Sequence, residues 1–142
     1  MKIEDLIRRK GTGVITIAPA ATVQALVDLL AEHNIGAVVV SSDGRVIDGI
    51  VSERDVVRHL ASDGPDVLAA AVASIMTADV KTASPEDEIE ETAHTMTYAR
   101  IRHLPVLVDG ELRALVSIGD VVKHRIDQLT DERNHLLGYL HT

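Results

Sequence analysis

The chain has 142 residues, a formal net charge of −8, no cysteine, and two tyrosines as its only aromatic residues. This length allows one compact domain or two small repeats that share a core. The absence of cysteine excludes a disulfide framework, a thiolate nucleophile and a Cys-ligated zinc. The acidic, ring-poor composition lacks the basic face of a nucleic-acid binder, and no stretch is apolar over the length of a membrane span. We therefore expect a cytoplasmic protein that binds neither nucleic acid nor membrane.

The hydropathy pattern of the first half predicts helix, strand, helix, hairpin and helix. Thr22 is a plausible N-cap, and Asp43-Gly44 separates two apolar runs in the manner of a hairpin turn. The expected elements are a helix at 4–10 ending in cations, a strand at 14–17, a helix from 23 to about 33, a hairpin at 37–51 and a helix from 53 to about 61.

The second half repeats this order after a polar break at residues 62–66. A small apolar helix over 67–76 is expected to pack between the two halves. The expected elements that follow are a strand over 77–82, a helix opening at Ser84 with the stripe Ile89, Thr92, Ala93 and Met96, a hairpin over 101–117 around Asp109-Gly110, and a helix from about 119 to 140.

The two halves are an internal duplication. Pro19 and Pro85 are 66 residues apart, as are the two Asp-Gly turns, whereas Ser52 and Ser117 are 65 apart. A fixed period of this length indicates tandem copies of one structural unit. The sequence therefore predicts a mixed α/β fold with two repeats packed sheet to sheet. The expected boundaries are 1–63 for the first repeat with its N-terminal helix, 64–126 for the linker helix and second repeat, and 127–142 for a helical tail.

The last helix is longer than its counterpart in the first half. Its stripe of Ile126, Leu129, Arg133, Leu136 and Leu140 follows spacings of three and four. This stripe either folds back on its own domain or forms a dimer seam, and the excess length favours the dimer.

Each hairpin ends in Ser-x-x-Asp, at Ser52 to Asp55 and at Ser117 to Asp120. One interpretation is a capping box, in which the serine caps the helix and the carboxylate reaches back to its N–H. The other is a ligand site, because helix-start N–H groups and the hydroxyl attract a phosphate while the carboxylate accepts both hydrogens of a ribose diol. Asp in place of the usual Glu or Gln slightly favours the ligand.

A basic pair, Arg102-His103, lies at the start of the second hairpin, where the first has Gly36-Ala37. Consecutive strand residues face opposite sides, so at most one of the pair points into the core. The pair is either a solvated basic edge or a set of cations beside a diphosphate, and Arg54 can serve the same charge.

Enzyme motifs are missing. The sequence has no phosphate-binding Gly-x-x-x-x-Gly-Lys loop, no Gly-x-Gly-x-x-Gly, no Gly-x-Ser-x-Gly and no His-Glu-x-x-His. Its seven histidines never fall in close pairs, which argues against a metal site. We expect no catalytic residue, no metal ligand and no catalytic cofactor.

The ordered set of motifs resembles a pair of CBS domains, together called a Bateman module. The resemblance covers about residues 11–126 and rests on Ser74-Ile-Met-Thr77, Arg102-His-Leu-Pro-Val106 and Leu115-Val-Ser-Ile-Gly-Asp120. Stand-alone bacterial proteins with one CBS pair and a helical tail are the most similar group. The resemblance implies a regulatory, signal-transducing module that binds an adenosyl ligand such as AMP, ADP, ATP, NAD(H) or S-adenosylmethionine in two clefts between the repeats.

The resemblance also implies which residues hold the ligand. Asp55 and Asp120 would bind ribose hydroxyls, with Ser52 and Ser117 near the phosphate. One cleft would comprise Thr12, Val14, Ile15, Ile35, Gly36 and Ala37 with Ser117 and Asp120. The other would comprise Thr77, Val80, Lys81, Ile101, Arg102 and His103 with Ser52, Arg54 and Asp55. The basic residues predict stronger phosphate binding in this second set.

The sequence therefore predicts a non-enzymatic regulator that forms a homodimer and changes shape when an adenine nucleotide or NAD(H) binds. The alternative is a nucleotide-free interaction subunit, in which the repeats are a scaffold, both Ser-x-x-Asp turns are caps, and the last helix grips an effector protein.

Overall fold

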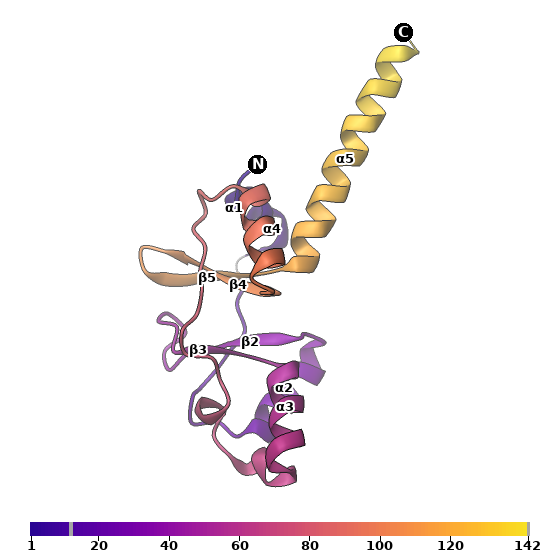
Figure 1. Ribbon diagram of the computed structural model, residues 1–142. Helices are drawn as coiled ribbons and strands as arrows, with labels where there is room; N and C mark the ends of the chain where they lie inside the picture. Colours follow the sequence, from indigo (N-terminus) through magenta and orange to yellow (C-terminus); the bar gives the residue numbers. More distant parts are fainter. Residues whose placement is uncertain (12, 142) are drawn as a thin grey trace.

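The computed structural model describes residues 1–11 and 13–141. Its elements lie in two layers, each a small sheet covered on its outer side by helices (Figure 1). The first repeat contains β1 (Thr16–Ile17), α2 (Val23–His33), β2 (Ala37–Val40), β3 (Gly49–Ser52) and α3 (Glu53–Asp63). The second contains α4 (Ile89–Tyr98), β4 (His103–Val108), β5 (Glu111–Ser117) and α5 (Ile118–Leu140).

Strand pairing confirms the duplication. In the first sheet β1 runs parallel to β2 and β2 antiparallel to β3, with Ile17 beside Val40. In the second, β4 pairs with β5, and Ala83 forms an isolated parallel bridge to Val106. Ala83 and Val106 are each 66 residues beyond Ile17 and Val40. The predicted strand at 77–82 is thus reduced to single bridges, and β1 is shorter than the predicted 14–17.

The two sheets face each other across the middle of the molecule. Side chains alternate along a strand, so Val38 and Val40 point to the core of the first repeat while Val39 points the other way. Val39 is fully buried, and so is Pro105 at the equivalent place in β4. Neither belongs to the core cluster of its own repeat, which is the pattern expected when each covers the opposite sheet.

The two hairpins turn differently. The second is the tight hairpin that was predicted, because Asp109 (φ +53°) and Gly110 (φ +79°) supply the two positive φ angles of a type I′ turn. The prediction of a tight first hairpin is wrong, because residues 41–48 form an eight-residue loop between β2 and β3. There the Asp43 carboxylate accepts hydrogen bonds from the N–H groups of Arg45 and Val46, at 2.8 and 2.9 Å. These two N–H groups therefore do not pair with the opposite strand.

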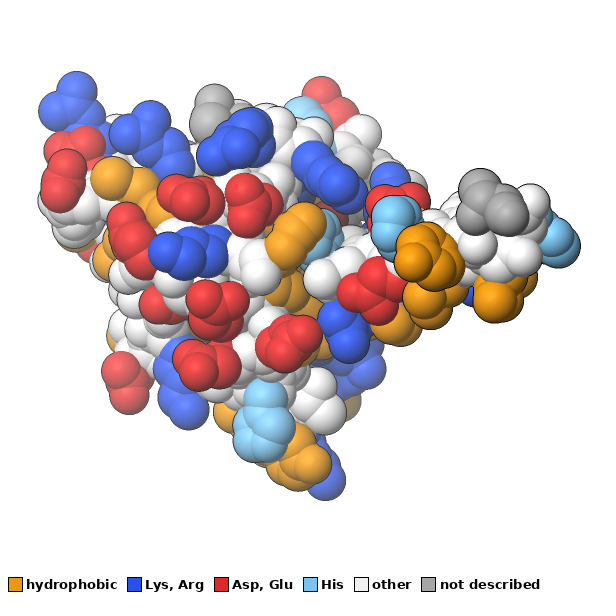
Figure 2. Space-filling view, turned by 90° about the horizontal axis from the view of Figure 1, so that it is seen from above, with side chains coloured by type: hydrophobic (Ala, Val, Ile, Leu, Met, Phe, Trp, Pro, Cys, Tyr) orange, Lys and Arg blue, Asp and Glu red, His pale blue; other side chains and the backbone are white. Residues whose placement is uncertain are grey.

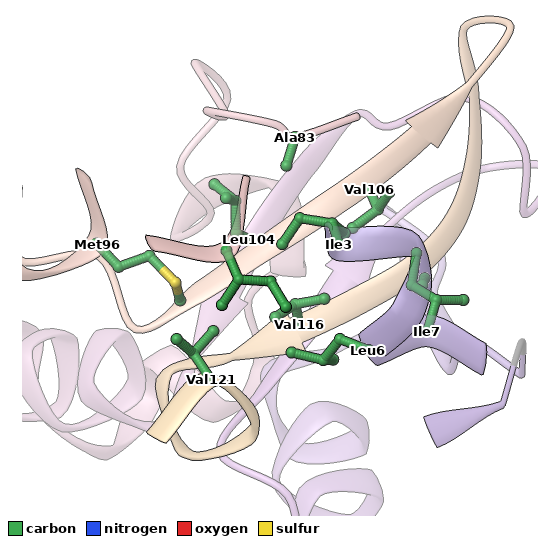
Figure 3. Close-up of a cluster of buried hydrophobic side chains, with 11 residues drawn as sticks. Ile3, Leu6, Ile7, Ala83, Met96, Leu104, Val106, Val116 and Val121 are labelled. Atoms are coloured by element: carbon green, nitrogen blue, oxygen red, sulfur yellow. The ribbon is translucent and has the colours of Figure 1, made fainter. Parts of the chain in front are cut away.

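The N-terminal helix α1 (Ile3–Lys10) packs on the second repeat, not the first. Its buried side chains Ile3, Leu6 and Ile7 lie in one cluster with Leu104 and Val116 of β4 and β5 (Figure 3). Its backbone is also fixed there. Ile3 N–H donates to Asp87 O at 2.9 Å, and Glu4 N–H donates to Pro85 O at 2.9 Å. These bonds hold residues 84–88 in a turn, so α4 begins at Ile89 and not at the predicted Ser84.

The segment after α3 contradicts the predicted interface helix. It forms two short 3₁₀ helices, η1 (Pro65–Ala69) and η2 (Val72–Ser74). The backbone between them pairs with residues 19–23, for example Val72 N–H to Ala21 O at 2.8 Å, which interrupts a continuous helix. Val67, Val72 and Ile75 are buried in the core of the first repeat, so this segment does not pack between the repeats.

The long helix α5 leaves the body of the molecule (Figure 1). Val121 and His124 are buried against the second repeat, but Ile126, Leu129 and Leu136 are 57, 48 and 64% exposed. The predicted length of this helix is confirmed, and the interpretation in which its stripe folds back on the same domain is wrong.

Candidate functional site: a cleft between the repeats

A cleft of about 600 Å³ opens between the two repeats. One wall is β3 with the start of α3, and the other is formed by residues 77–81 and 99–103. Thr77 fixes the second wall against the first, since its N–H and C=O exchange two 2.9 Å hydrogen bonds with Ile50. All nine residues predicted for one ligand site line this cleft: Ser52, Arg54, Asp55, Thr77, Val80, Lys81, Ile101, Arg102 and His103.

The turn from Ser52 to Asp55 forms a complete capping box at the edge of the cleft. Asp55 N–H donates to Ser52 Oγ at 3.3 Å, and Ser52 N–H donates to Asp55 Oδ2 at 2.8 Å. The Ser52 hydroxyl also donates to Oδ2, at 3.1 Å. Among the described residues, Asp55 Oδ1 has no hydrogen-bond partner. The capping and ligand-binding interpretations are therefore compatible, because the cap uses one carboxylate oxygen and leaves the other.

The cleft is more cationic than the chain as a whole. Five Lys or Arg residues line it against three Asp or Glu residues, in a chain with a net charge of −8. Phosphate groups are bound most strongly by such charged donors, arginine above all. The five cations are Arg54, Arg58, Lys81, Arg100 and Arg102.

His103 lies where the two hairpins meet. It is half-buried, and a Cβ placed on Gly36 would lie 3.7 Å from its Cε1 atom and 3.5 Å from Glu53 Oε1. Burial lowers the pKa of His103, and the charge of Lys10 lowers it further, outweighing the opposite effects of Asp120 and Glu53. The lowered pKa favours the neutral form of His103 at pH 7, so the cationic charge of the cleft comes from the arginines and Lys81.

Asp120, the counterpart of Asp55, has a different environment. Its capping box is the same, with Ser117 N–H at 2.9 Å from Oδ2, but Lys10 Nζ also lies 2.5 Å from Oδ2. Lys10 donates in addition to Leu115 O at 2.7 Å. Burial acts to raise the pKa of Asp120, but the hydrogen bonds from Lys10 and Ser117 outweigh it and hold the pKa below its usual value. Asp120 lines a separate, smaller cavity of about 240 Å³.

The set predicted around Asp120 is not brought together in one cavity. Gly36 and Ala37 line the large cleft instead. Ile15 and Ile35 pack against the core of the first repeat, and the small cavity is completed by α1 and α5. The predicted residue Thr12 lies outside the described residues. Val14, Ile15, Ile35 and Ser117 line neither of the two cavities.

Several cleft residues were missed by the sequence reasoning. Arg58 is one helical turn beyond Arg54, so its (i, i+4) spacing was a usable signal. Glu53 immediately follows the predicted Ser52. Arg100 precedes Arg102 and adopts a positive φ of +56°, which no sequence pattern indicated. Asp79 and Ile50 reach the cleft only because residues 77–81 run beside β3.

Two further observations apply to the described residues alone. No three His, Asp or Glu side chains among them are grouped to hold a metal ion. None of their helices combines the length and apolar character needed to cross a membrane.

A duplicated unit of strand, helix, hairpin and helix, with a charged cleft where its two copies meet, defines a small two-repeat ligand-binding module. The family model of the CBS domain matches residues 3–62 and again 72–127. The chain therefore belongs to the CBS-domain family, and its two repeats form a tandem CBS pair.

Relatives and solved structures agree with this assignment. The chain is 33% identical to the mitochondrial CBS domain-containing protein CBSX3 of Arabidopsis thaliana, over 97% of this chain and 71% of that protein. The crystal structure of the CBS-domain protein ATU1752 from Agrobacterium tumefaciens is similar with a TM-score of 0.84 and 39% identity, over 88% of this chain and 99% of that one. The CBS domain protein PAE2072 from Pyrobaculum aerophilum, complexed with AMP, is similar with a TM-score of 0.73 and 26% identity, over 84% and 89% of the chains.

Proposed function

We propose that this protein is a non-enzymatic regulatory module that binds an adenosyl ligand, AMP, ADP, ATP or NAD(H), in the large cleft and acts as a homodimer. The observation that carries the proposal is the convergence of nine predicted residues from both repeats on one cleft. Its volume of about 600 Å³ is in the range of small-molecule sites. The complex of the related PAE2072 with AMP supports the ligand class.

Each part of such a ligand has a matching group in the cleft. The Asp55 carboxylate accepts hydrogen bonds from the ribose diol, and Arg54, Arg58 and Arg102 pair with phosphate oxygens. The adenine ring lies against the apolar side chains of Val80 and Ile101. A ligand bound this way joins the two repeats, so it favours whichever arrangement of them fits it better, and that unequal affinity is the regulatory signal.

The proposal assigns one ligand to each chain. The carboxylate of Asp55 has an oxygen available, whereas Asp120 is ion-paired with Lys10 in a cavity less than half the size. This asymmetry supports the prediction of a stronger site around Arg102 and a weaker or empty counterpart.

Asp55→Asn tests the proposal. Calorimetric titration of nucleotide-free protein with AMP, ADP, ATP, NAD, NADH and S-adenosylmethionine should identify a ligand bound by the wild type. The substitution removes a charge-assisted hydrogen bond to the ribose, so affinity should fall about 10- to 100-fold. Asp63→Asn, at the exposed far end of the same helix, is the matched control, and Asp120→Asn should also leave the affinity unchanged. Failure of every ligand to bind would remove the proposal.

The second candidate is a nucleotide-free interaction subunit. Its support is that both Ser-x-x-Asp turns do form capping boxes and that α5 projects with exposed apolar side chains. Absorbance separates the two candidates. With two tyrosines and no tryptophan, the protein absorbs little at 280 nm, so co-purified nucleotide is visible as excess absorbance at 260 nm.

A further inference from the structure

The helix before each hairpin ends at a residue with a left-handed backbone. Asn34 follows α2 with φ +51°, and Arg100 follows the C-cap of α4 with φ +56°. The two positions are 66 residues apart, which is the period of the duplication. The left-handed turn therefore belongs to the repeated unit and occurs in both copies.

One backbone hydrogen bond closes each of these turns. Ile35 N–H donates to Leu30 O at 3.1 Å, and Ile101 N–H donates to Met96 O at 2.9 Å. Each bond closes a Schellman motif, in which the residue before the donor adopts the left-handed conformation. The backbone at this position is thus fixed by the fold, whichever side chain occupies it.

The two copies differ in how well the residue suits the turn. Glycine and asparagine tolerate a left-handed backbone, whereas in other residues Cβ lies too close to a carbonyl oxygen. Asn34 is therefore a suitable residue in the first repeat, and Arg100 is a strained one in the second. The Arg100 side chain is exposed and makes no hydrogen bond or ion pair within residues 1–11 and 13–141. Packing in the second repeat does not explain the arginine.

The large cleft supplies a reason for Arg100. The residue lines this cleft beside Ile101, whereas Asn34 lines neither cavity. Strained residues persist where a functional site uses the side chain. The whole chain is acidic, and Figure 2 shows acidic and basic side chains interspersed over one of its faces. The five cations that line the cleft, Arg100 among them, are therefore a local enrichment.

A purine base is commonly held by stacking on a flat group, and this cleft has no tyrosine to provide one. The aromatic side chains of the chain are Tyr98 and Tyr139, and neither lines the cleft. Bases also stack on the guanidinium plane of arginine, which is attracted to the face of a ring. Arg100 directly precedes Ile101, against which the adenine is proposed to lie, so its guanidinium can cover that ring.

We propose that Arg100 is the base-stacking residue of the large cleft. Its guanidinium lies on the face of the adenine ring, while other arginines of the cleft meet the phosphates. The left-handed strain at Arg100 is retained because the ligand-bound state uses that side chain. This inference rests on the proposed function and adds to it the residue that recognises the base.

Arg100→Lys and Arg100→Asn separate stacking from charge. Lysine keeps the positive charge and the strain but has no planar group, so stacking predicts that both variants lose affinity by about tenfold. AMP and ATP are the probes in calorimetric titration. They share one base and differ in their phosphates, so the loss should be the same factor for both. Arg113→Lys, at an exposed position of β5 outside both cavities, is the matched control and should bind as the wild type does.

Thermal unfolding of the nucleotide-free protein tests the strain by itself. Arg100→Asn should raise the melting temperature by about 2–4 °C, because asparagine relieves the left-handed strain. Asn34→Arg, the reciprocal exchange in the first repeat, should lower the melting temperature by a similar amount and leave the affinity for AMP unchanged. An Arg100→Asn variant no more stable than the wild type would overturn the inference, because the arginine would then carry no cost that needs a functional reason.

The outcomes distinguish this inference from the proposed function. Wild-type affinity in Arg100→Lys would show that the cleft uses the charge of Arg100 and not its plane, which overturns the stacking while nucleotide binding stands. A larger loss with ATP than with AMP would likewise assign Arg100 to the phosphates. Failure of the wild type to bind AMP or ATP would overturn the stacking, and the proposed function as well if every other adenosyl ligand also fails.

Discussion

Lys10 links the end of α1 to the second repeat through a single carboxylate. Its ammonium group bonds Asp120 at 2.5 Å and Leu115 O at 2.7 Å, and the Asp120 side chain is only 28% exposed. Within residues 1–11 and 13–141, no cation forms an ion pair with Asp55. Asp55 and Asp120 occupy equivalent positions in the two repeats, but the ion pair with Lys10 gives Asp120 a different environment in the folded protein.

Lys10→Met should lower the free energy of unfolding by up to about 1 kcal/mol at pH 7, because the Lys10 side chain is itself 42% exposed and solvent screens the pair. The folded-state pKa of Asp120 is lowered, so its contribution is present above the unfolded value of about 3.9 and is lost as pH falls through the folded-state pKa. Urea unfolding of both proteins should thus show a difference at pH 7 that begins to shrink below about pH 4 and vanishes below the folded-state pKa of Asp120.

Lys123→Met is the control for this experiment. It removes a cation from the same cavity but breaks no ion pair of the described residues. A pH-independent difference for Lys10→Met would mean that the lysine stabilises by packing and not by pairing with Asp120.

At the scale of elements, the start of α3 has two roles in one turn. Ser52 satisfies an N–H of the first helical turn and also lines the cleft. A helix whose start also forms a binding surface can lose affinity simply because its first turn frays, so cap and ligand effects must be measured separately.

Ser52→Ala should destabilise the ligand-free protein by about 1 kcal/mol, the usual cost of losing an N-cap side chain. Thermal or urea unfolding without nucleotide measures the cap alone. Ser62→Ala, near the C-terminal end of the same helix, removes an exposed hydroxyl that caps no N–H and should change stability little. Equal stability of Ser52→Ala and wild type would show that the 3.3 Å hydrogen bond contributes nothing.

At the scale of the whole molecule, the two repeats exchange their flanking segments. The N-terminal helix α1, which precedes the first repeat, completes the core of the second, and residues 65–75, which precede the second repeat, complete the core of the first. Each repeat therefore depends on the segment that precedes the other repeat, and the two sheets bury Val39 and Pro105 between them. This arrangement predicts one cooperative unfolding transition.

Ile3→Ala tests that coupling. Ile3 is fully buried, so its truncation should cost about 2–5 kcal/mol. Scanning calorimetry should show a single peak moved to lower temperature, with equal calorimetric and van't Hoff enthalpies. Glu4→Ala, exposed in the same helical turn, should leave the peak nearly in place. Two separate peaks, of which only one moves, would show that the repeats unfold independently.

Features set by nearby residues were readable from the sequence. The cap at Thr22 and the tight turn at Asp109-Gly110 formed as predicted. Nine residues of the large cleft were also predicted, from the places that the resemblance to a CBS pair gives them, whereas Glu53, Arg58 and Arg100 were missed. Of the predicted residues, Ser52, Arg54 and Asp55 lie at a helix start and His103 at a strand start, where the geometry depends on short-range steric and hydrogen-bonding preferences.

Features that depend on distant partners were decided only by the tertiary structure. Nothing in residues 3–10 indicates whether their apolar stripe covers the first or the second sheet, and that choice places Lys10 on Asp120. The apolar run at 67–76 was predicted as one helix but formed two short ones, because residues 19–23 offered its backbone other hydrogen bonds. A local sequence pattern indicates that a helix face must be buried or that an N–H group needs a hydrogen-bond acceptor. Which residue buries that face or accepts that hydrogen bond depends on the tertiary structure.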